Sequence, residues 1–364
     1  MALTKVDQTM VSDQVFGRRN VVTNGGMQVA QRGTQTGLGA SSGVYGATDR
    51  FCIVTNGIGG RMTIEQSTDT PSGFGNSVKL SCTTTDTSLA AGDYLSFSTR
   101  LEGIDMQRFA KGTSDAEKFA VSFYVKGNAN ATYVCELYEY DNFRHVSQTF
   151  SVTTAWTRVE LSFPADTTGA IDNDSNLSFA INIYLHAGSN FNSGTLQTTW
   201  SGSGYRATGT DNFFDSTSRT LFLTGVQLEV GDKPTPFEHL PFDEQSSLCK
   251  RYYQQYSGFH AMAMWTYGRN NASMQFVLEK EMRTKSTFSY SGTLGNLSPN
   301  TECGIYEADW VTIDSLGASS SAEASNSKMI RIDSSHPANS FASNNVAVGF
   351  YAGANFFLKF DAEL

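Results

Sequence analysis

Alternation of hydrophobic and polar positions is the strongest signal in the first two thirds of the chain. In residues 119–127, FAVSFYVKG, every second residue from Phe119 to Val125 is Phe or Val. Residues 177–187, LSFAINIYLHA, and residues 157–163, TRVELSF, repeat the pattern. A period of two is typical of strands that bury one face and show the other to solvent. Clusters of Gly, Asn, Asp and Ser separate these segments and predict turns.

These segments predict an all-β protein with two sandwich domains. The first is a jelly-roll β-sandwich of about eight strands over residues 21–240, because an immunoglobulin-like unit of about 100 residues is too small for them. A short junction with a helix is expected over residues 241–256. A second, smaller β-sandwich follows over residues 257–364, and residues 1–20 form a polar N-terminal arm.

The segment VQLEVGDKPTPFEHLPFDEQSSLCKRYYQQY, residues 226–256, changes character twice. Residues 226–230 alternate and predict the last strand of the first sandwich. Three prolines follow, and because proline cannot join a central ladder they predict an extended strap, with Phe237 packed against the sandwich. Asp243 is then a candidate N-cap. Positions four apart predict a helix whose buried face holds Leu248, Tyr252 and Tyr256.

Composition and charge exclude two classes of partner. Charged residues make up 17% of the chain, and the formal net charge is −9. Because no basic run is present, we expect no nucleic-acid binding, which depends on clustered Lys and Arg. The same lack argues against an anionic membrane surface, and no apolar stretch is long enough to insert into a membrane. Apolar residues at 39% can supply cores, so disorder is not expected.

The cysteines predict neither disulfides nor a zinc site. Their number is odd and no CxxC pair occurs, so we expect five buried, unpaired thiols in a chain made in a reducing compartment. They are Cys52, Cys82, Cys135, Cys249 and Cys303.

No catalytic motif is present, so we predict that the protein is not an enzyme and has no cofactor. The chain lacks GxSxG, HExxH and phosphate-loop patterns. A pair of carboxylates for glycoside hydrolysis needs only to be close in space. A polysaccharide-degrading enzyme therefore remains an alternative.

One acidic segment, DNDSNLSFAINI, partly matches a calcium loop. Its first three ligand positions fit, but Leu177 stands in the place of the glycine and Ile183 in that of the bidentate glutamate. We therefore predict no metal site of that type. A different calcium site in these loops or a solvated turn are the alternatives, and its weak candidate ligands are Asp166, Asp172 and Asp174.

Aromatic residues are the better functional candidates. Trp265, Tyr267 and Arg269 stand at alternate positions and share one face of a predicted strand. Aromatic faces and an arginine fork suit sugars or a protein epitope. The alternative is that both rings belong to the core. Trp310 is a fourth candidate, and residues 314–328 are expected to form a long polar loop.

Several segments together resemble one family. The segment NVVTNGGMQVAQRG (residues 20–33), then YGATDRF, SFYVKG and WTRVELSFPADTTG, the junction 226–256, and the terminal LKFDAEL follow the order found in phage tail fibre and related virion proteins. These have an N-terminal jelly-roll domain like a carbohydrate-binding module. The chain departs from the pattern at Phe51, where Trp is common, and in EMRTKSTF, which lacks the usual proline after Met-Arg.

The resemblance implies a virion component that is assembled in the host cytoplasm. It implies a homotrimer mounted on other tail or head proteins through the arm of residues 1–20. It also implies that the tip domain, residues 257–364, contacts a host-surface glycan or protein. The alternatives are a head-attached fibre or decoration protein and a polysaccharide-degrading tailspike enzyme.

Overall fold

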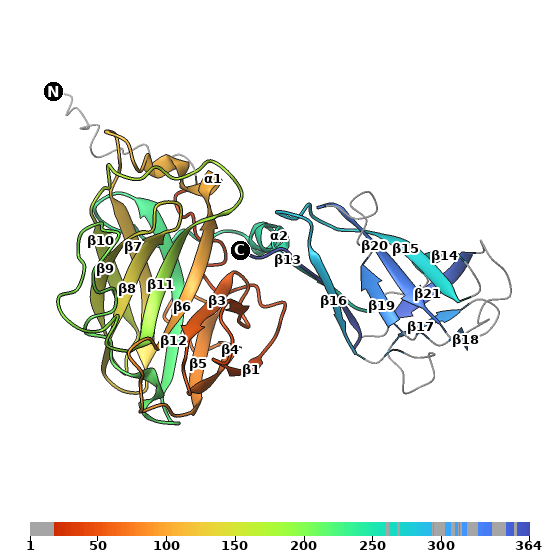
Figure 1. The fold of residues 1–364 in the computed structure, drawn as a ribbon, viewed down its shortest axis with the longest axis horizontal. Coiled ribbons are helices and arrows are strands. Elements are labelled where there is room, and N and C mark those ends of the chain that lie inside the picture. Colours follow the sequence, from red (N-terminus) through yellow and green to blue (C-terminus); the bar gives the residue numbers. More distant parts are fainter. Residues whose placement is uncertain are drawn as a thin grey trace, which may run out of the picture. The chain divides into compact units, whose positions relative to one another are not determined.

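The chain forms two compact units. The computed structural model describes residues 18–258, 262–267, 270–292, 294, 303–306, 310–311, 313, 315–318, 327–336, 347–352 and 355–364. The units divide between Gln245 and Ser246, and Leu364 belongs to the first (Figure 1). The division falls within the predicted junction. The domain boundaries given above stay predictions, and most of the expected arm lies outside the described residues.

Two antiparallel sheets of six strands build the first unit (Figure 1). The first sheet has the order β1 (Gln35–Leu38), β4 (Arg61–Ser67), β5 (Ser77–Thr84), β12 (Thr220–Val230), β7 (Phe119–Gly127), β10 (Thr157–Phe163). The second has the order β2 (Val44–Tyr45), β3 (Phe51–Asn56), β6 (Tyr94–Glu102), β11 (Leu177–Ala187), β8 (Ala131–Glu139), β9 (Arg144–Val152).

The predicted all-β jelly-roll sandwich is confirmed, but its described part has twelve strands rather than about eight. Two of the additional strands are edge strands. β1 has four residues and β2 has two, so neither is long enough for a period of two to be recognised in the sequence.

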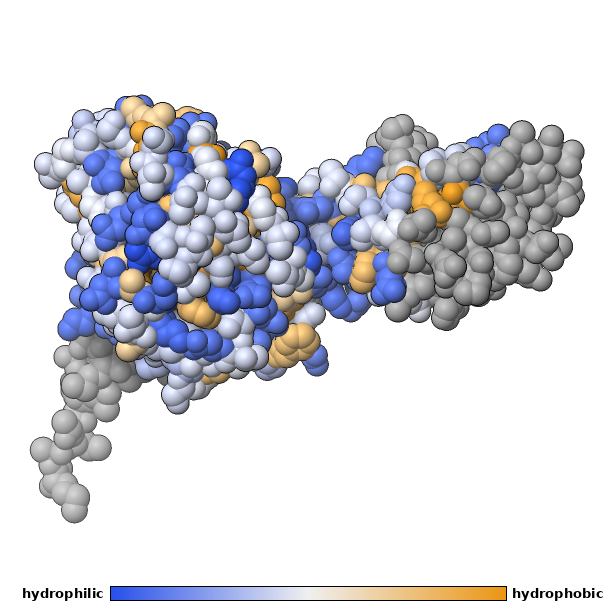
Figure 2. All heavy atoms as spheres, turned by 90° about the horizontal axis from the view of Figure 1, so that it is seen from below, coloured by the Kyte–Doolittle hydropathy of each residue, from blue (hydrophilic) through white to orange (hydrophobic). Residues whose placement is uncertain are grey.

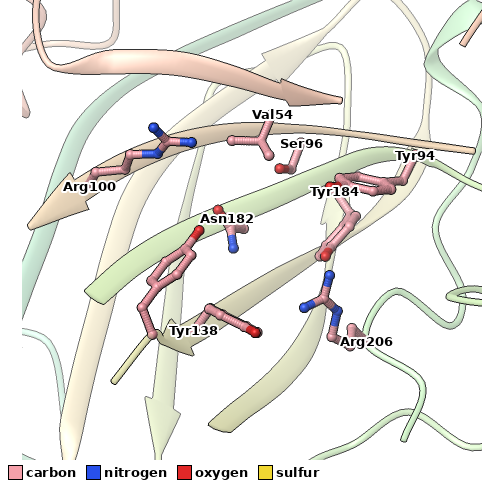
Figure 3. A pocket seen from close by; sticks show the side chains of 9 residues that line it. Val54, Tyr94, Ser96, Arg100, Tyr138, Asn182, Tyr184 and Arg206 are labelled. Atoms are coloured by element: carbon pink, nitrogen blue, oxygen red, sulfur yellow. The ribbon is translucent and has the colours of Figure 1, made fainter. Parts of the chain in front are cut away.

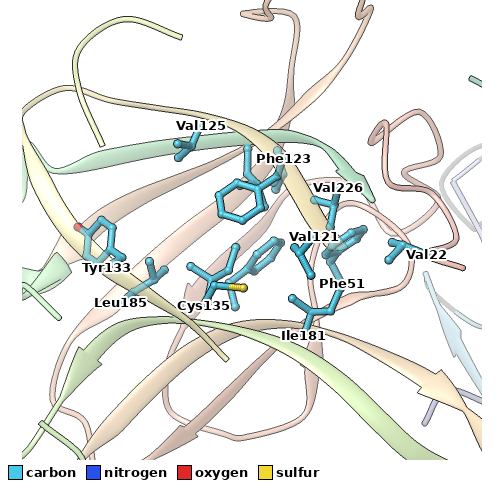
Figure 4. Close-up of a cluster of buried hydrophobic side chains, with 14 of the residues drawn as sticks. Val22, Phe51, Val121, Phe123, Val125, Tyr133, Cys135, Ile181, Leu185 and Val226 are labelled. Carbon is cyan, nitrogen blue, oxygen red and sulfur yellow. The ribbon is translucent and has the colours of Figure 1, made fainter. Parts of the chain in front are cut away.

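The apolar faces predicted by alternation meet between the two sheets. Figure 4 shows Val121, Phe123 and Val125 of β7 facing side chains of the other sheet, among them Cys135 and Ile181. The three β7 side chains are completely buried. Burying one such side chain contributes about 1.5–3 kcal/mol, so the alternating residues largely account for the stability of the sandwich.

Two segments that carry the family resemblance hold each other in place. The side chain of Asn20 donates a hydrogen bond to the carbonyl of Val226 (3.1 Å) and accepts one from the amide of Leu228 (3.0 Å). The carboxylate of Glu238 accepts hydrogen bonds from the amides of Arg19 (2.9 Å) and Asn20 (2.8 Å). These motif residues therefore have a structural role that joins the start of the described chain to β12 and the strap.

The strap has the predicted form, and its contact with the sandwich is confirmed. Residues 231–241 contain no strand, and the ring of Phe237 lies 5.1 Å from that of Phe74. Glu229 at the end of β12 accepts a hydrogen bond from the amide of Thr235 (2.7 Å). A side chain of the last strand thus fixes the extended segment that follows it.

The helix after the strap is shorter than predicted. Helix α2 is Phe242–Lys250, so Asp243 lies in its first turn and does not precede it. Tyr252 and Tyr256 are not helical, and Tyr253–Tyr256 forms β13, which pairs with β22 (Phe357–Asp361). The predicted face through residue 256 was wrong because aromatic residues also suit a half-buried ladder, and the C-terminal strand supplies that ladder.

The other helical segments are short. They are α1 (Gly103–Met106), η3 (Gln107–Phe109) and η4 (Phe213–Asp215). Within the described part of the chain, no helix has both the length and the apolar character needed to cross a membrane.

The second unit is a smaller sandwich, as predicted. A three-stranded sheet has the order β13, β22, β16 (Thr287–Ser291). The other sheet has the order β18 (Trp310–Val311), β17 (Cys303–Tyr306), β21 (Ala347–Ala352), β14 (Met262–Thr266), β15 (Asn271–Val277), β20 (Met329–Ser335), β19 (Ser315–Ala318). The sheets meet where Phe276 of β15 stacks on Phe360 of β22, with ring centroids 5.1 Å apart.

The loop expected at residues 314–328 begins with a strand. Ser315–Ala318 is β19, and it pairs with β20 from Ser315 opposite Ser335 to Ala318 opposite Ile332. The polar composition concealed this edge strand, in which Leu316 is a buried hydrophobic residue and Ser315 and Gly317 are exposed. Residues 319–326 lie outside the described residues.

Candidate functional site

A hollow of about 270 Å³ lies on the outer face of the second six-stranded sheet. We call it the groove. It is lined by aromatic and polar side chains from several elements (Figure 3), namely Val54, Tyr94, Ser96, Arg100, Tyr138, Tyr140, Asn182, Tyr184 and Arg206.

Neighbouring strands place these residues on one face. In β6 and β11 every second side chain points away from the core, and the register sets Tyr184 opposite Ser96 and Asn182 opposite Ser98. β8 continues the row on the far side of β11, where Glu136 lies opposite Asn182. The floor of the groove is thus a cross-strand array of hydroxyl, amide and phenol groups.

A long segment between β11 and β12 folds back over the sheet and provides a wall. The amide of Ser147 in β9 donates a hydrogen bond to the carbonyl of Gln197 (2.7 Å), and that of His145 donates to Ser201 (2.8 Å). Arg206 belongs to this segment, and Figure 3 shows its guanidinium directed towards Tyr184. The groove therefore depends on residues distant in sequence.

Buried hydrogen bonds fix the floor. The hydroxyl of Ser98 donates to the side-chain oxygen of Asn182 (2.6 Å), and the Asn182 amide nitrogen donates to Glu136 (2.8 Å). All three residues are buried. Because both ends of the Asn182 amide have partners, its orientation is determined, and the strands beneath the groove are held in register by side chains as well as backbone.

Arg206 neutralises the buried carboxylate. Its Nε atom lies 3.4 Å from Oε1 of Glu136, and its guanidinium lies 5.0 Å from the ring centre of Tyr138 and 5.4 Å from that of Phe191. Burial raises the pKa of Glu136, and Arg206 and Asn182 oppose that rise. Burial alone would lower the pKa of Arg206, but Glu136 and Tyr184 raise it, so the arginine stays charged.

Three phenols of the groove, those of Tyr138, Tyr140 and Tyr184, stay neutral at physiological pH. Burial raises the pKa of Tyr140 to about 12 and also raises those of Tyr138 and Tyr184. A neutral phenol both donates and accepts hydrogen bonds. The groove thus offers aromatic rings, hydroxyls, an amide and two guanidinium groups, and no carboxylate is among its described lining residues.

The weak calcium candidates are not brought together into a cation site. Asp166 accepts hydrogen bonds from Arg144 at 2.7 and 3.0 Å and lies 3.1 Å from the Lys111 ammonium. The carboxylate of Asp174 accepts from the backbone amide of Asn176 (2.9 Å), and Asp172 belongs to no metal-binding group. In the described ranges no three His, Cys, Asp or Glu residues are grouped to hold a metal. The oxygens of Asp166 are instead contacted by two cationic side chains, Arg144 and Lys111, and the calcium site stays a prediction.

The aromatic candidates of the second unit lie on an exposed sheet surface. Trp265 is 60% exposed and Tyr267 is 41% exposed, so the alternative that both belong to the core was wrong. Arg269 lies outside the described residues, and Trp310 belongs to β18 with a side chain that is not described. A hollow of about 480 Å³, which we call the Trp265 face, is lined by Ala263, Trp265, Ser273, Met274, Gln275 and Arg331.

The groove was not predicted from the sequence. Its signal was present in the alternation itself, because Asn182 and Tyr184 stand on the side of β11 that was expected to face water. Both are buried, since the segment carrying Arg206 lies above them. A row of phenol and amide groups on the outer side of adjacent strands is recognisable only when the strand order is known.

For four of the cysteines the expected burial outside disulfides is confirmed. Cys52, Cys82, Cys135 and Cys249 are buried, and none of them forms a disulfide bond. Burial raises the pKa of Cys82 and Cys135, so these thiols are poor nucleophiles. The side chain of Cys303 lies outside the described residues.

Comparisons with known proteins find only distant structural likeness. No protein-family model matches the chain, and no curated protein matches it. The enzymatically active domain of tailspike protein 4 from bacteriophage CBA120 has a TM-score of 0.30 and 12% identity, covering 58% of this chain and 21% of that one. A family 11 carbohydrate-binding module from Clostridium thermocellum has a TM-score of 0.27 and 12% identity, covering 55% and 95%.

A third solved structure contains the CBM22-1 and GH10 modules of xylanase 10B from Clostridium thermocellum, complexed with xylohexaose. It has a TM-score of 0.31 and 13% identity, and the match covers 59% of this chain and 29% of that one. This chain thus spans less than a third of the matched tailspike and xylanase chains. At these scores the likenesses carry no argument about ligands, and the sandwich assignment rests on the chain's own two sheets.

Proposed function

We propose that the protein is a non-enzymatic glycan-binding protein and that the groove of the first unit holds the glycan. The observation that carries this proposal is the cluster of phenols and guanidinium groups that the Ser98–Asn182–Glu136 hydrogen bonds and Arg206 fix in place.

The chemistry of the groove matches that of a sugar chain. A pyranose ring has apolar C–H faces that pack on aromatic rings and hydroxyls that pair with phenol, amide and guanidinium groups. Because the lining side chains are already ordered, little rotamer freedom is lost on binding. A volume of about 270 Å³ lies near the lower end of ligand sites, which suits a few sugar units of a longer chain.

The absence of catalysis is part of the proposal. Glycoside hydrolysis needs two carboxyl groups beside the scissile bond. Glu136, the acid beneath the groove, is fully buried and paired with Arg206, so it does not reach a ligand. Incubation with a bound polysaccharide should release no reducing ends, and release of new ends would favour the tailspike alternative.

We further propose that the protein is a virion tail fibre that assembles as a homotrimer and binds the host surface. This step is supported by the order of the family-like motifs and by four buried cysteines that form no disulfide bond. Light scattering at micromolar concentration should give three times the chain mass, and a monomer would contradict the trimer. Labelled antibody on intact particles separates a tail mount from a head-attached fibre or decoration protein.

The test of the groove uses an array of immobilised bacterial surface polysaccharides and the full chain. Tyr138→Ala removes the ring that faces Arg206 and should lower the affinity for the retained polysaccharide roughly tenfold, equivalent to about 1.4 kcal/mol. Tyr205→Ala is the matched control, because Tyr205 is 38% exposed, adjoins Arg206 in sequence and does not line the groove. Equal affinities of both variants and the parent protein would refute the assignment.

A further inference from the structure

We infer that the Trp265 face of the second unit is a separate binding site for a neutral pyranose sugar. This site shares no residue with the groove, and it does not depend on the groove being occupied. The inference rests on the exposure of Trp265, on the polar groups placed around it and on the balance of charge there.

Trp265 is exposed in the middle of a sheet rather than at its edge. Its strand, β14, is the fourth in the order of seven strands. Trp265 itself is 60% exposed to solvent. Its cross-strand partner on β15 is Ser273. Because directly opposed residues lie only about 4.5–5.5 Å apart, a serine there leaves much of the indole ring uncovered. The ring is thus a flat apolar platform within the hollow.

Polar side chains surround the platform in fixed positions. Nε of Arg331 lies 2.8 Å from Oδ1 of Asp333, and its guanidinium lies 5.5 Å from the ring centre of Tyr267. Gln275 is opposite Arg331 in the ladder between β15 and β20. Across the described part of the unit, no hydrogen bond is formed by the side chains of Trp265 or Gln275. Both can therefore pair with an incoming ligand.

The balance of charge selects the class of ligand. Arg331 and Asp333 cancel each other, so an anionic or cationic partner gains little net attraction at this face. A neutral sugar gains more, because its C–H face packs on the indole while adjacent hydroxyls pair with the planar amide and guanidinium groups. The hollow of about 480 Å³ lies within the range of small-ligand sites. A neutral pyranose fits these features best.

The test measures saturation-transfer NMR of the full-length protein with three probes: methyl glucoside, methyl galactoside and N-acetylglucosamine. At least one probe should receive saturation on its ring protons. Variants of the Trp265 face are made in the Tyr138→Ala background, so that binding of a probe in the groove does not contribute to the signal. In that background Trp265→Ala should abolish the signal, and Gln275→Ala should weaken it at least twofold. Tyr138→Ala, which alters the groove, should leave it in place.

Val277→Ala is the matched control on β15, because Val277 is 70% exposed and does not line the hollow. It should keep the full signal. The inference is overturned if no probe receives saturation, or if the signal survives when Trp265→Ala is combined with Tyr138→Ala. It is also overturned if Trp265→Ala changes the mass found by light scattering, since the face would then be an interface between copies. If the polysaccharide array shows no binding in the groove, the expected NMR result for the Trp265 face is unchanged. The two proposals can therefore fail independently.

Discussion

The groove of the first unit and the Trp265 face of the second both combine aromatic rings with a guanidinium group, but they differ in what lies beneath. Under the groove are buried polar groups, Asn182 and Glu136, which depend on Arg206. Under the Trp265 face are apolar side chains such as Met274 and Phe276, which are buried in a core cluster. On the face that Figure 2 shows, the coloured surface is mostly hydrophilic to neutral, with hydrophobic residues in small groups.

This difference separates binding from stability. Changes to polar residues under the groove should destabilise the first unit, because a buried charge that loses its partner is costly. Changes to exposed residues of the Trp265 face should affect binding alone. We therefore expect the largest losses of stability where a charge buried in the first unit loses its partner, whether beneath the groove or elsewhere in that unit.

Lys111→Met should have the largest effect on stability. The ammonium of Lys111 is buried and lies 3.3 Å from Glu139, 3.1 Å from Asp166 and 2.7 Å from the carbonyl of Gly169. Its removal leaves Glu139 buried with its charge unpaired, so the free energy of unfolding of the first unit should fall by about 3–5 kcal/mol. Urea unfolding measures this, and a loss below about 1 kcal/mol would mean that the cluster is unimportant.

Arg206→Met should destabilise the first unit by about 3 kcal/mol at pH 7, because it leaves the Glu136 carboxylate unpaired. The lower end of the range is expected, since the Arg206 side chain is 22% exposed. The double variant Arg206→Met with Glu136→Gln should recover most of the loss in the same urea experiment. If the double variant does not recover this loss, Arg206 stabilises the first unit mainly by packing on the aromatic rings and not by its charge.

Lower pH should increase the contribution of Glu136 to the stability of the first unit. Because burial raises the pKa of this residue in the folded state, its protonated form is bound more tightly there than in the unfolded chain. Its contribution to stability is therefore complete below the ordinary glutamate pKa and is lost as pH rises through the folded-state pKa. Stability of the parent relative to Glu136→Gln should fall as pH rises above about 4.5. If the difference in stability between the parent protein and Glu136→Gln does not change with pH, the pKa of Glu136 is the same in the folded and the unfolded state.

Trp265→Ala should have the smallest effect on stability. Its side chain is mostly exposed, and surface changes of this kind are usually within about 0.5 kcal/mol. The urea midpoint of the second unit should therefore stay close to that of the parent protein. A loss of about 3 kcal/mol or more is typical of a buried aromatic side chain. It would show that Trp265, like the polar residues under the groove, is needed for stability.

The strands with long alternating runs could be predicted from the sequence, and the groove could not. Phe119, Phe123, Ile181 and Ile183 are buried as their alternation indicates, because period-two patterning depends only on local sequence. The groove needs β6, β11 and β8 side by side and a segment from beyond β11 folded over them. That arrangement depends on strand order and on long-range contacts, which one sequence without its structure does not reveal.

Two other outcomes illustrate the same limit. Trp265 was recognised as a candidate from residue type alone, but whether it belonged to the core or to the surface depended on the position of β14 within its sheet. The four-residue spacing of Leu248, Tyr252 and Tyr256 suggested a single helix, yet a strand about 100 residues later in the chain pairs with residues 253–256. Predictions from local patterns were correct where no strand distant in sequence imposes a different secondary structure on the segment.

Hydroxyl-radical footprinting of the full-length protein with the polysaccharide it retains on the array shows whether the glycan lies in the groove. If it does, bound polysaccharide should protect Tyr94, Tyr138 and Tyr140 from oxidation, while Tyr205 and Phe143, both exposed outside the groove, should remain as reactive as in the free protein. Unchanged oxidation of the three groove tyrosines at saturating polysaccharide would contradict this placement of the glycan.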